Sequence, residues 1–249
     1  MLPSLRAVVA LSFLGLSFGT AGAWTPATRT RIADEAIRFM PPSLRLALER
    51  YRDDVRRGML EPLTGEDERG HRPSWDDGTL DTEIAARMDA VVRAAGKPKS
   101  FREVARAFGA LAHFVSDAGF PPGAAGRPGA VRYAHFGAFC ESRTPKFPLV
   151  FYGHDDPSLE ADDARGFALS ILEESRAADG ELARAYSAAG TPPNPAAFDD
   201  RSVPFAVGSL SYSKTISYVV RAWLAAWGRA QGDLARTPYL KTAETYHRR

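Results

Sequence analysis

Apolar positions recur at helical spacing through most of the chain, and stretches rich in proline and glycine separate the helical segments. The pattern predicts helices over residues 25–40, 41–58, 80–95, 100–119, 158–189 and 205–228. The last of these is apolar almost all round, which indicates a helix buried at the centre of the fold. No alternating pattern typical of paired strands is found. The sequence therefore predicts an all-α, single-domain, multi-helix bundle.

The segments between these helices differ in character. Residues 61–78 are polar and irregular, and residues 121–129 are predicted to form a loop before a short segment at 133–141. Residues 191–204 resemble a linker, and the helix over 158–189 is predicted to be either continuous or broken near Gly180. None of these segments separates two domains.

The first 23 residues have the three parts of a secretory signal. Arg6 supplies a positive charge, Ala7 to Phe18 form an apolar stretch too short to cross a bilayer, and Ala21-Gly22-Ala23 matches an A-x-A cleavage site. We expect cleavage after Ala23, which leaves residues 24–249 as one exported helical domain, periplasmic or extracellular. Trp24 then carries a free α-amine that is available to a metal, or it is an ordinary packed aromatic residue.

Composition narrows the possible partners. The formal net charge is +2 and both signs are interspersed, which favours neither a nucleic-acid tail nor a polybasic membrane patch. The single cysteine, Cys140, excludes an internal disulfide, and its apolar context indicates a buried, inert thiol. After the signal, no apolar run is long enough for a transmembrane helix.

Among the five histidines, His113 stands out because Asp117 follows four residues later on the same predicted helix. Side chains at this spacing lie on one helical face. An imidazole and a carboxylate together are able to hold a divalent metal, while a His–Asp hydrogen bond or a solvated pair is the alternative.

Other ligand candidates lie in less regular surroundings. His71 follows the carboxylates Glu61 and Asp67 in the irregular segment, where a loop aims side chains freely. His135 and His154 are either ligands or ordinary polar residues. Nucleophile-elbow, H-E-x-x-H, P-loop and dinucleotide motifs are not found, so metal-assisted hydrolysis is the reaction class that the residue types favour.

Taken together, these features resemble the zinc-dependent phospholipase C / P-one nuclease family. The resemblance covers about residues 24–141, and its most specific part is the segment HFVSDAGFPP, which begins at His113 and is similar to the family's H-Y-x-x-D-x-x-x-P. It implies a helical bundle with up to three zinc ions. It also implies that the amine and carbonyl of Trp24 are ligands and that Asp117 bridges two metals.

The chain departs from the family at several ligand positions. Arg29 stands where the family has a histidine in the first helix, Gly123 replaces another histidine, and Phe139 replaces a glutamate four residues after His135. A guanidinium stays protonated and is not a zinc ligand. Arg29 is instead expected to replace a metal's charge and to bind a phosphate group.

The sequence thus predicts a secreted zinc-dependent phosphodiester hydrolase with a reduced metal site, which most simply holds one zinc ion. Its substrate is a phospholipid head group or another small phosphoester, and nucleic acid is less expected. The alternative is a catalytically degenerate, exported helical binding or scaffold protein. The proposed metal ligands are Trp24, Glu61, His71, His113, Asp117 and His135, and the proposed catalytic residues are Asp117 and Arg29.

Overall fold

The computed structural model describes residues 23–64, 67–96, 100–190 and 198–240. The predicted signal, apart from Ala23, lies outside these residues. All regular elements in the described ranges are helices, which confirms the predicted all-α class. The α-helices are α1 (Pro26–Ile37), α2 (Pro42–Arg50), α3 (Arg52–Leu60), α4 (Leu80–Ala95), α5 (Phe101–Ala118), α6 (Pro121–Ala125), α7 (Tyr133–Arg143), α8 (Pro157–Glu160), α9 (Ala164–Ala189) and α10 (Val203–Arg229). Short 3₁₀ helices are η1 (Glu61–Thr64), η2 (Glu68–His71), η3 (Ser74–Asp76), η4 (Arg127–Arg132) and η5 (Thr144–Lys146).

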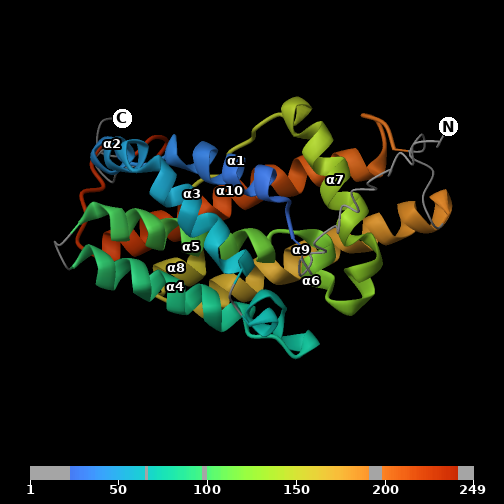
Figure 1. The fold of residues 1–249 in the computed structure, drawn as a ribbon, viewed down its shortest axis with the longest axis horizontal. Helices are drawn as coiled ribbons and strands as arrows, with labels where there is room; N and C mark the ends of the chain where they lie inside the picture. Colours follow the sequence, from blue (N-terminus) through green and yellow to red (C-terminus); the bar gives the residue numbers. More distant parts are fainter. Residues whose placement is uncertain (1–22, 65–66, 97–99, 191–197, 241–249) are drawn as a thin grey trace, which may run out of the picture.

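Helices α5 and α10 form the centre of an elongated bundle. Helix α5 packs against α3, α4 and α10, while α10 also contacts α1 and α9, and α1 lies along α10 in Figure 1. Phe108 of α5 and Trp223 of α10 meet edge to face, with ring centroids 5.4 Å apart, and Trp223 Nε1 donates to the Phe108 carbonyl at 2.9 Å. The apolar character of segment 205–228 therefore reflects contacts on several sides of α10, as predicted.

Two glycines allow α3 and α5 to cross closely. A Cβ atom added to Gly109 would lie 2.0 Å from the Val55 carbonyl oxygen, and one added to Gly58 would lie 2.1 Å from that of Arg106. Neither position has room for a side chain, so the backbones touch directly. This crossing brings the end of α3 against the middle of α5, where the candidate site lies.

The start of α5 follows from local sequence. Ser100 is the N-cap residue, and its hydroxyl accepts a hydrogen bond from the backbone N–H of Arg102 at 3.2 Å. Ser and Thr hydroxyls satisfy the free N–H groups at a helix start in this way. The predicted helix boundary at residue 100 is confirmed.

Helix boundaries elsewhere differ from the prediction. The expected helix over 41–58 is two helices that meet at Tyr51, whose backbone (φ −107°, ψ 29°) is not helical. The expected loop over 121–129 contains α6 and part of η4. The break in 158–189 falls at residues 161–163 rather than at Gly180, because Asp162 adopts φ 56° and Asp163 caps a continuous α9.

Three other expectations concern the irregular segment 61–78, the cysteine and membrane-spanning helices. The irregular segment 61–78 contains the short helices η1, η2 and η3. Cys140 is fully buried, and burial raises the pKa of its thiol well above its usual value, in agreement with an inert cysteine. Within the described ranges, every helix is either too short or too polar to cross a membrane.

Candidate metal centre

Helix α5 supplies two of the three side chains that converge in the bundle. His113 and Asp117 lie one turn apart and are both buried, with 0 % and 1 % of their surface exposed. His113 Nε2 is 3.3 Å from Asp117 Oδ2. The predicted arrangement on one helical face is therefore present, and the face points into the protein rather than into solvent.

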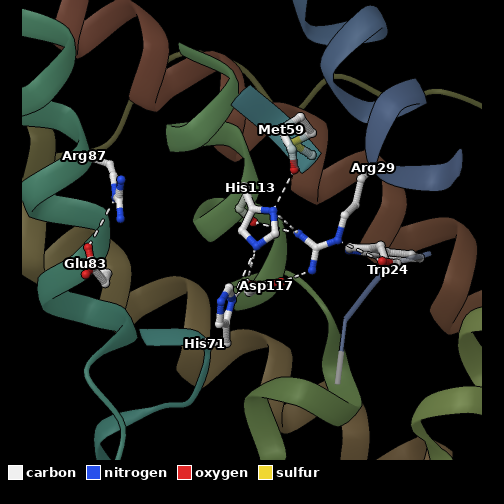
Figure 2. Close-up of polar contacts among 8 residues, drawn as sticks. All are labelled: Trp24, Arg29, Met59, His71, Glu83, Arg87, His113 and Asp117. Carbon is white, nitrogen blue, oxygen red and sulfur yellow. Dashed lines mark hydrogen bonds and ion pairs between the residues drawn. The ribbon is translucent and has the colours of Figure 1, made fainter. Parts of the chain in front are cut away.

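The third side chain, His71, ends the short helix η2. Asp67 caps η2 by accepting from the backbone N–H of Arg69, and Gly70 lies against Phe114 of α5 and Glu83 of α4. The His71 ring stacks on the Phe114 ring, with centroids 5.2 Å apart and an interplanar angle of 21°. This packing aims His71 Nδ1 at the two groups on α5 (Figure 2).

Hydrogen bonds determine which ring nitrogens face the centre. His113 Nδ1 donates to the carbonyl of Met59, at the end of α3, at 2.7 Å, so the lone pair of Nε2 points toward His71 and Asp117. His71 Nδ1 donates to Asp117 Oδ2 at 2.7 Å and lies 3.4 Å from His113 Nε2. Histidines that bind metals typically have their other ring nitrogen hydrogen-bonded in this way, as His113 Nδ1 is to the Met59 carbonyl.

These three atoms fit a zinc ion. Bonds of about 2.0–2.1 Å at tetrahedral angles place ligand atoms about 3.3–3.4 Å apart. The distances from His113 Nε2 to the other two atoms are 3.3 and 3.4 Å. The shorter contact between His71 and Asp117 is a hydrogen bond, and coordination requires the proton on His71 Nδ1 to shift to Nε2. Two imidazoles and one carboxylate leave a fourth position open.

Arg29 of α1 lies beside this cluster and is 1 % exposed. Its Nε donates to the Trp24 carbonyl at 2.9 Å, one terminal nitrogen donates to the His113 carbonyl at 3.2 Å, and the other binds Asp117 Oδ1 (Figure 2). We expected this guanidinium to hold a phosphate group, and the contacts described for it are to atoms of the protein itself.

The surroundings keep Asp117 and His113 in the charge states that bind metals. Burial alone would raise the pKa of Asp117, but the charge of Arg29 and the hydrogen bond from His71 hold it far below its usual value. Burial, together with the charge of Arg29, lowers the pKa of His113. A carboxylate anion and a neutral imidazole are the forms that coordinate zinc.

Several predicted ligands lie elsewhere. Glu61 begins η1 with its side chain exposed and is not part of the cluster. His135 of α7 is hydrogen-bonded through Nδ1 to the Tyr186 hydroxyl at 2.7 Å, and His154 Nε2 donates to a backbone carbonyl. Trp24 is buried against Phe120, and its carbonyl oxygen faces Arg29.

The sequence carried no signal for two parts of the site. The Met59 carbonyl orients His113, and any residue type supplies a backbone carbonyl. The stacking of His71 on Phe114 depends on how η2 packs, although Phe114 lies next to His113 in the sequence. Both contacts follow from tertiary structure.

The fold is related to that of two bacterial toxins. The chain superposes on the alpha-toxin of Clostridium perfringens from avian strain SWCP with a TM-score of 0.59 and 15% identity, over 86% of this chain. The alpha-toxin of Clostridium absonum gives a TM-score of 0.59 and 12% identity, over 89% of this chain. The chain spans 66% of the length of each toxin chain. No protein-family model and no curated protein sequence matches it.

Proposed function

We propose that the protein is an exported zinc-dependent phosphodiester hydrolase that works through a reduced metal site. The observation that carries the proposal is the convergence of His71 Nδ1, His113 Nε2 and Asp117 Oδ2 within 3.4 Å of one another. The resemblance of the HFVSDAGFPP segment to zinc-dependent phospholipases C and the toxin-like fold support it.

Zinc suits these ligands better than magnesium or calcium does. Magnesium and calcium prefer all-oxygen sites, whereas imidazole nitrogen with one carboxylate is a common zinc set. Catalytic zinc sites have three protein ligands and one open position. When bound, zinc lowers the pKa of a water molecule and polarises a phosphoryl oxygen. The residues around it hold the ligands in place and exclude bulk water.

The substrate reaches the cluster from the side of His71. The His71 side chain is 9 % exposed, whereas those of His113 and Asp117 are enclosed. Arg87 of α4 lies 4.8 Å from the centre of the Phe114 ring on which His71 stacks, and it pairs with Glu83 at 3.4 Å (Figure 2). A phosphoester that approaches His71 therefore meets a positive charge that Glu83 partly neutralises. Phospholipid head groups and small phosphodiesters are the substrate classes we propose.

The test measures zinc content and turnover on the same protein. We expect about one zinc per chain and hydrolysis of bis(p-nitrophenyl) phosphate or p-nitrophenylphosphorylcholine that a chelator abolishes and added zinc restores. His113→Ala should lose both zinc and turnover, whereas His135→Ala, at a histidine outside the cluster, should keep both. A wild-type protein that is free of zinc and inactive after zinc addition would contradict the proposal.

One observation favours the alternative of a degenerate binding or scaffold protein. Arg29 already neutralises Asp117, so the cluster is held together by hydrogen bonds and an ion pair of its own. In that case zinc would leave the thermal unfolding midpoint unchanged, because a ligand stabilises a folded protein only when it binds to that protein. Calorimetry with and without zinc distinguishes the two functions.

A further inference from the structure

The site contains a second position for positive charge, and a side chain fills it. The Arg29 guanidinium is enclosed by the carbonyl oxygens of Trp24 and His113 and by Asp117 Oδ1. Its NH1 atom also lies 3.1 Å from His113 Nδ1, which donates to Met59. Carbonyl and carboxylate oxygens are also the ligands of divalent cations. The pocket that holds the guanidinium therefore has the chemistry of a cation site.

Asp117 divides its two oxygens between this position and the proposed zinc position. Oδ1 binds Arg29, and Oδ2 lies 2.7 Å from His71 Nδ1 and 3.3 Å from His113 Nε2. With zinc bound to Oδ2, this carboxylate would lie between two positive charges. Arg29 supplies one of them permanently, because a guanidinium stays protonated in proteins.

We infer that Arg29 is a resident cation that takes the place of a second metal ion, so that the site binds a single zinc and its ligands are arranged before zinc arrives. Arg29 acts through Asp117 as a positioning residue, since its contacts are to protein atoms. The inference rests on the proposed zinc function of the same cluster. A second divalent ion is disfavoured because Oδ1 is occupied and like charges repel.

The experiment compares the full exported chain with Arg29→His, Arg29→Lys and Arg29→Met, and zinc alone is the probe. Arg29→His replaces the cation with a shorter, neutral nitrogen ligand and frees the three oxygens. Calorimetry and metal analysis should give one zinc per chain for the wild type and for Arg29→Lys, and two for Arg29→His. Arg29→Met should weaken zinc binding about 10- to 100-fold, the usual loss when a group that orients a metal ligand is removed, because this loss exceeds the gain from removing a like charge.

Arg132→Met is the matched control. Arg132 also forms a buried pair with an aspartate, Asp179, but this pair joins η4 and α9, and among the described residues no imidazole contacts its carboxylate. The Arg132→Met substitution should lower the thermal unfolding midpoint and leave the affinity for zinc unchanged. Cobalt in place of zinc adds a spectroscopic readout: the visible absorption bands should change in Arg29→Met and stay the same in Arg132→Met.

Two results on zinc stoichiometry would overturn the inference: two zinc ions per wild-type chain, or one zinc ion per Arg29→His chain when circular dichroism shows that this variant is folded. Equal losses of zinc affinity in Arg29→Met and Arg132→Met would also overturn the inference. This comparison is the deciding test in the event that Arg29→His does not fold. Turnover is scored separately. A wild-type protein that binds one zinc with the expected Arg29 dependence and hydrolyses no phosphodiester contradicts the proposed function alone.

Discussion

The Arg29–Asp117 pair and the Arg132–Asp179 pair have the same two residue types and similar burial, yet their carboxylates behave differently. Side-chain exposure is 1 % and 1 % in the first pair and 9 % and 7 % in the second. Asp117 also contacts His71 and His113. The difference between the pairs lies in the additional partners rather than in the ion pair itself.

The pKa of each aspartate reflects this difference. Burial raises the pKa of Asp179 above its usual value, and Arg132 only partly offsets that effect. Burial acts on Asp117 in the same direction, but the charge of Arg29, with the hydrogen bond from His71, reverses it. Asp179 joins η4 to α9 through its pair with Arg132.

The largest expected effect is on stability. Asp117→Asn should lower the free energy of unfolding by about 3–5 kcal/mol, the typical cost of leaving one charge of a buried pair without its partner. Asp179→Asn should cost less, because Arg132 keeps some contact with solvent. Urea unfolding of both variants and the wild type measures this. Equal losses would show that the imidazole contacts of Asp117 add nothing.

The next effect concerns metal affinity. His71→Ala should weaken zinc binding about 100-fold or more, since removing a ligand costs at least as much as removing a partner of one. His135→Ala should change it little, because His135 is bonded to the Tyr186 hydroxyl and lies outside the cluster. Competition with a zinc-sensitive dye measures both. If both variants lose zinc equally, the assignment of the site is wrong.

The two aspartates should also respond oppositely to pH. The folded pKa of Asp117 is lowered, so its contribution to stability is present above the usual aspartate pKa of about 3.9 and is lost only as pH falls toward the lowered value. The folded pKa of Asp179 is raised, so its contribution is present below about 3.9 and is lost as pH rises through the raised value.

The free energy of unfolding of the wild type, Asp117→Asn and Asp179→Asn between pH 3 and 7 tests this. Above the usual aspartate pKa, the difference between the wild type and Asp117→Asn should stay constant. The stability of the wild type relative to Asp179→Asn should fall as pH rises. A constant difference for Asp179→Asn would contradict the raised pKa.

The smallest loss of stability is expected at an ion pair whose arginine is exposed to solvent. Asp81 is buried, but the side chain of Arg165, which binds it at 2.6 Å, is 60 % exposed. Arg165→Ala should cost less than Arg132→Met, because removal of the exposed guanidinium opens the Asp81 carboxylate to water, which replaces part of the contact. Thermal unfolding next to Arg132→Met checks this. A loss of stability as large as that of Arg132→Met would show that the exposure of the arginine does not determine how much stability is lost.

Much of the scaffold and part of the site were predictable from the sequence. Helical periodicity and the Ser100 cap located α5, and the spacing of His113 and Asp117 placed both on one face of it. The division at Tyr51 and the helix α6 were missed, because short helices depend on tertiary packing more than on local pattern. The position of Glu61 outside the cluster was not predictable, since carboxylates in an irregular segment look alike in the sequence.

The sequence by itself determined the helical class, the pair on α5 and the unusual arginine at position 29, because spacing and residue type depend only on chain order. The tertiary structure decided that His71, and not Glu61 or His135, joins that pair, and that Arg29 faces Trp24 and Asp117. The physical reason is that these contacts join residues far apart in the chain. Only the packing of η2 and α1 against α5 sets their distances, and those distances decide which groups are able to share a cation.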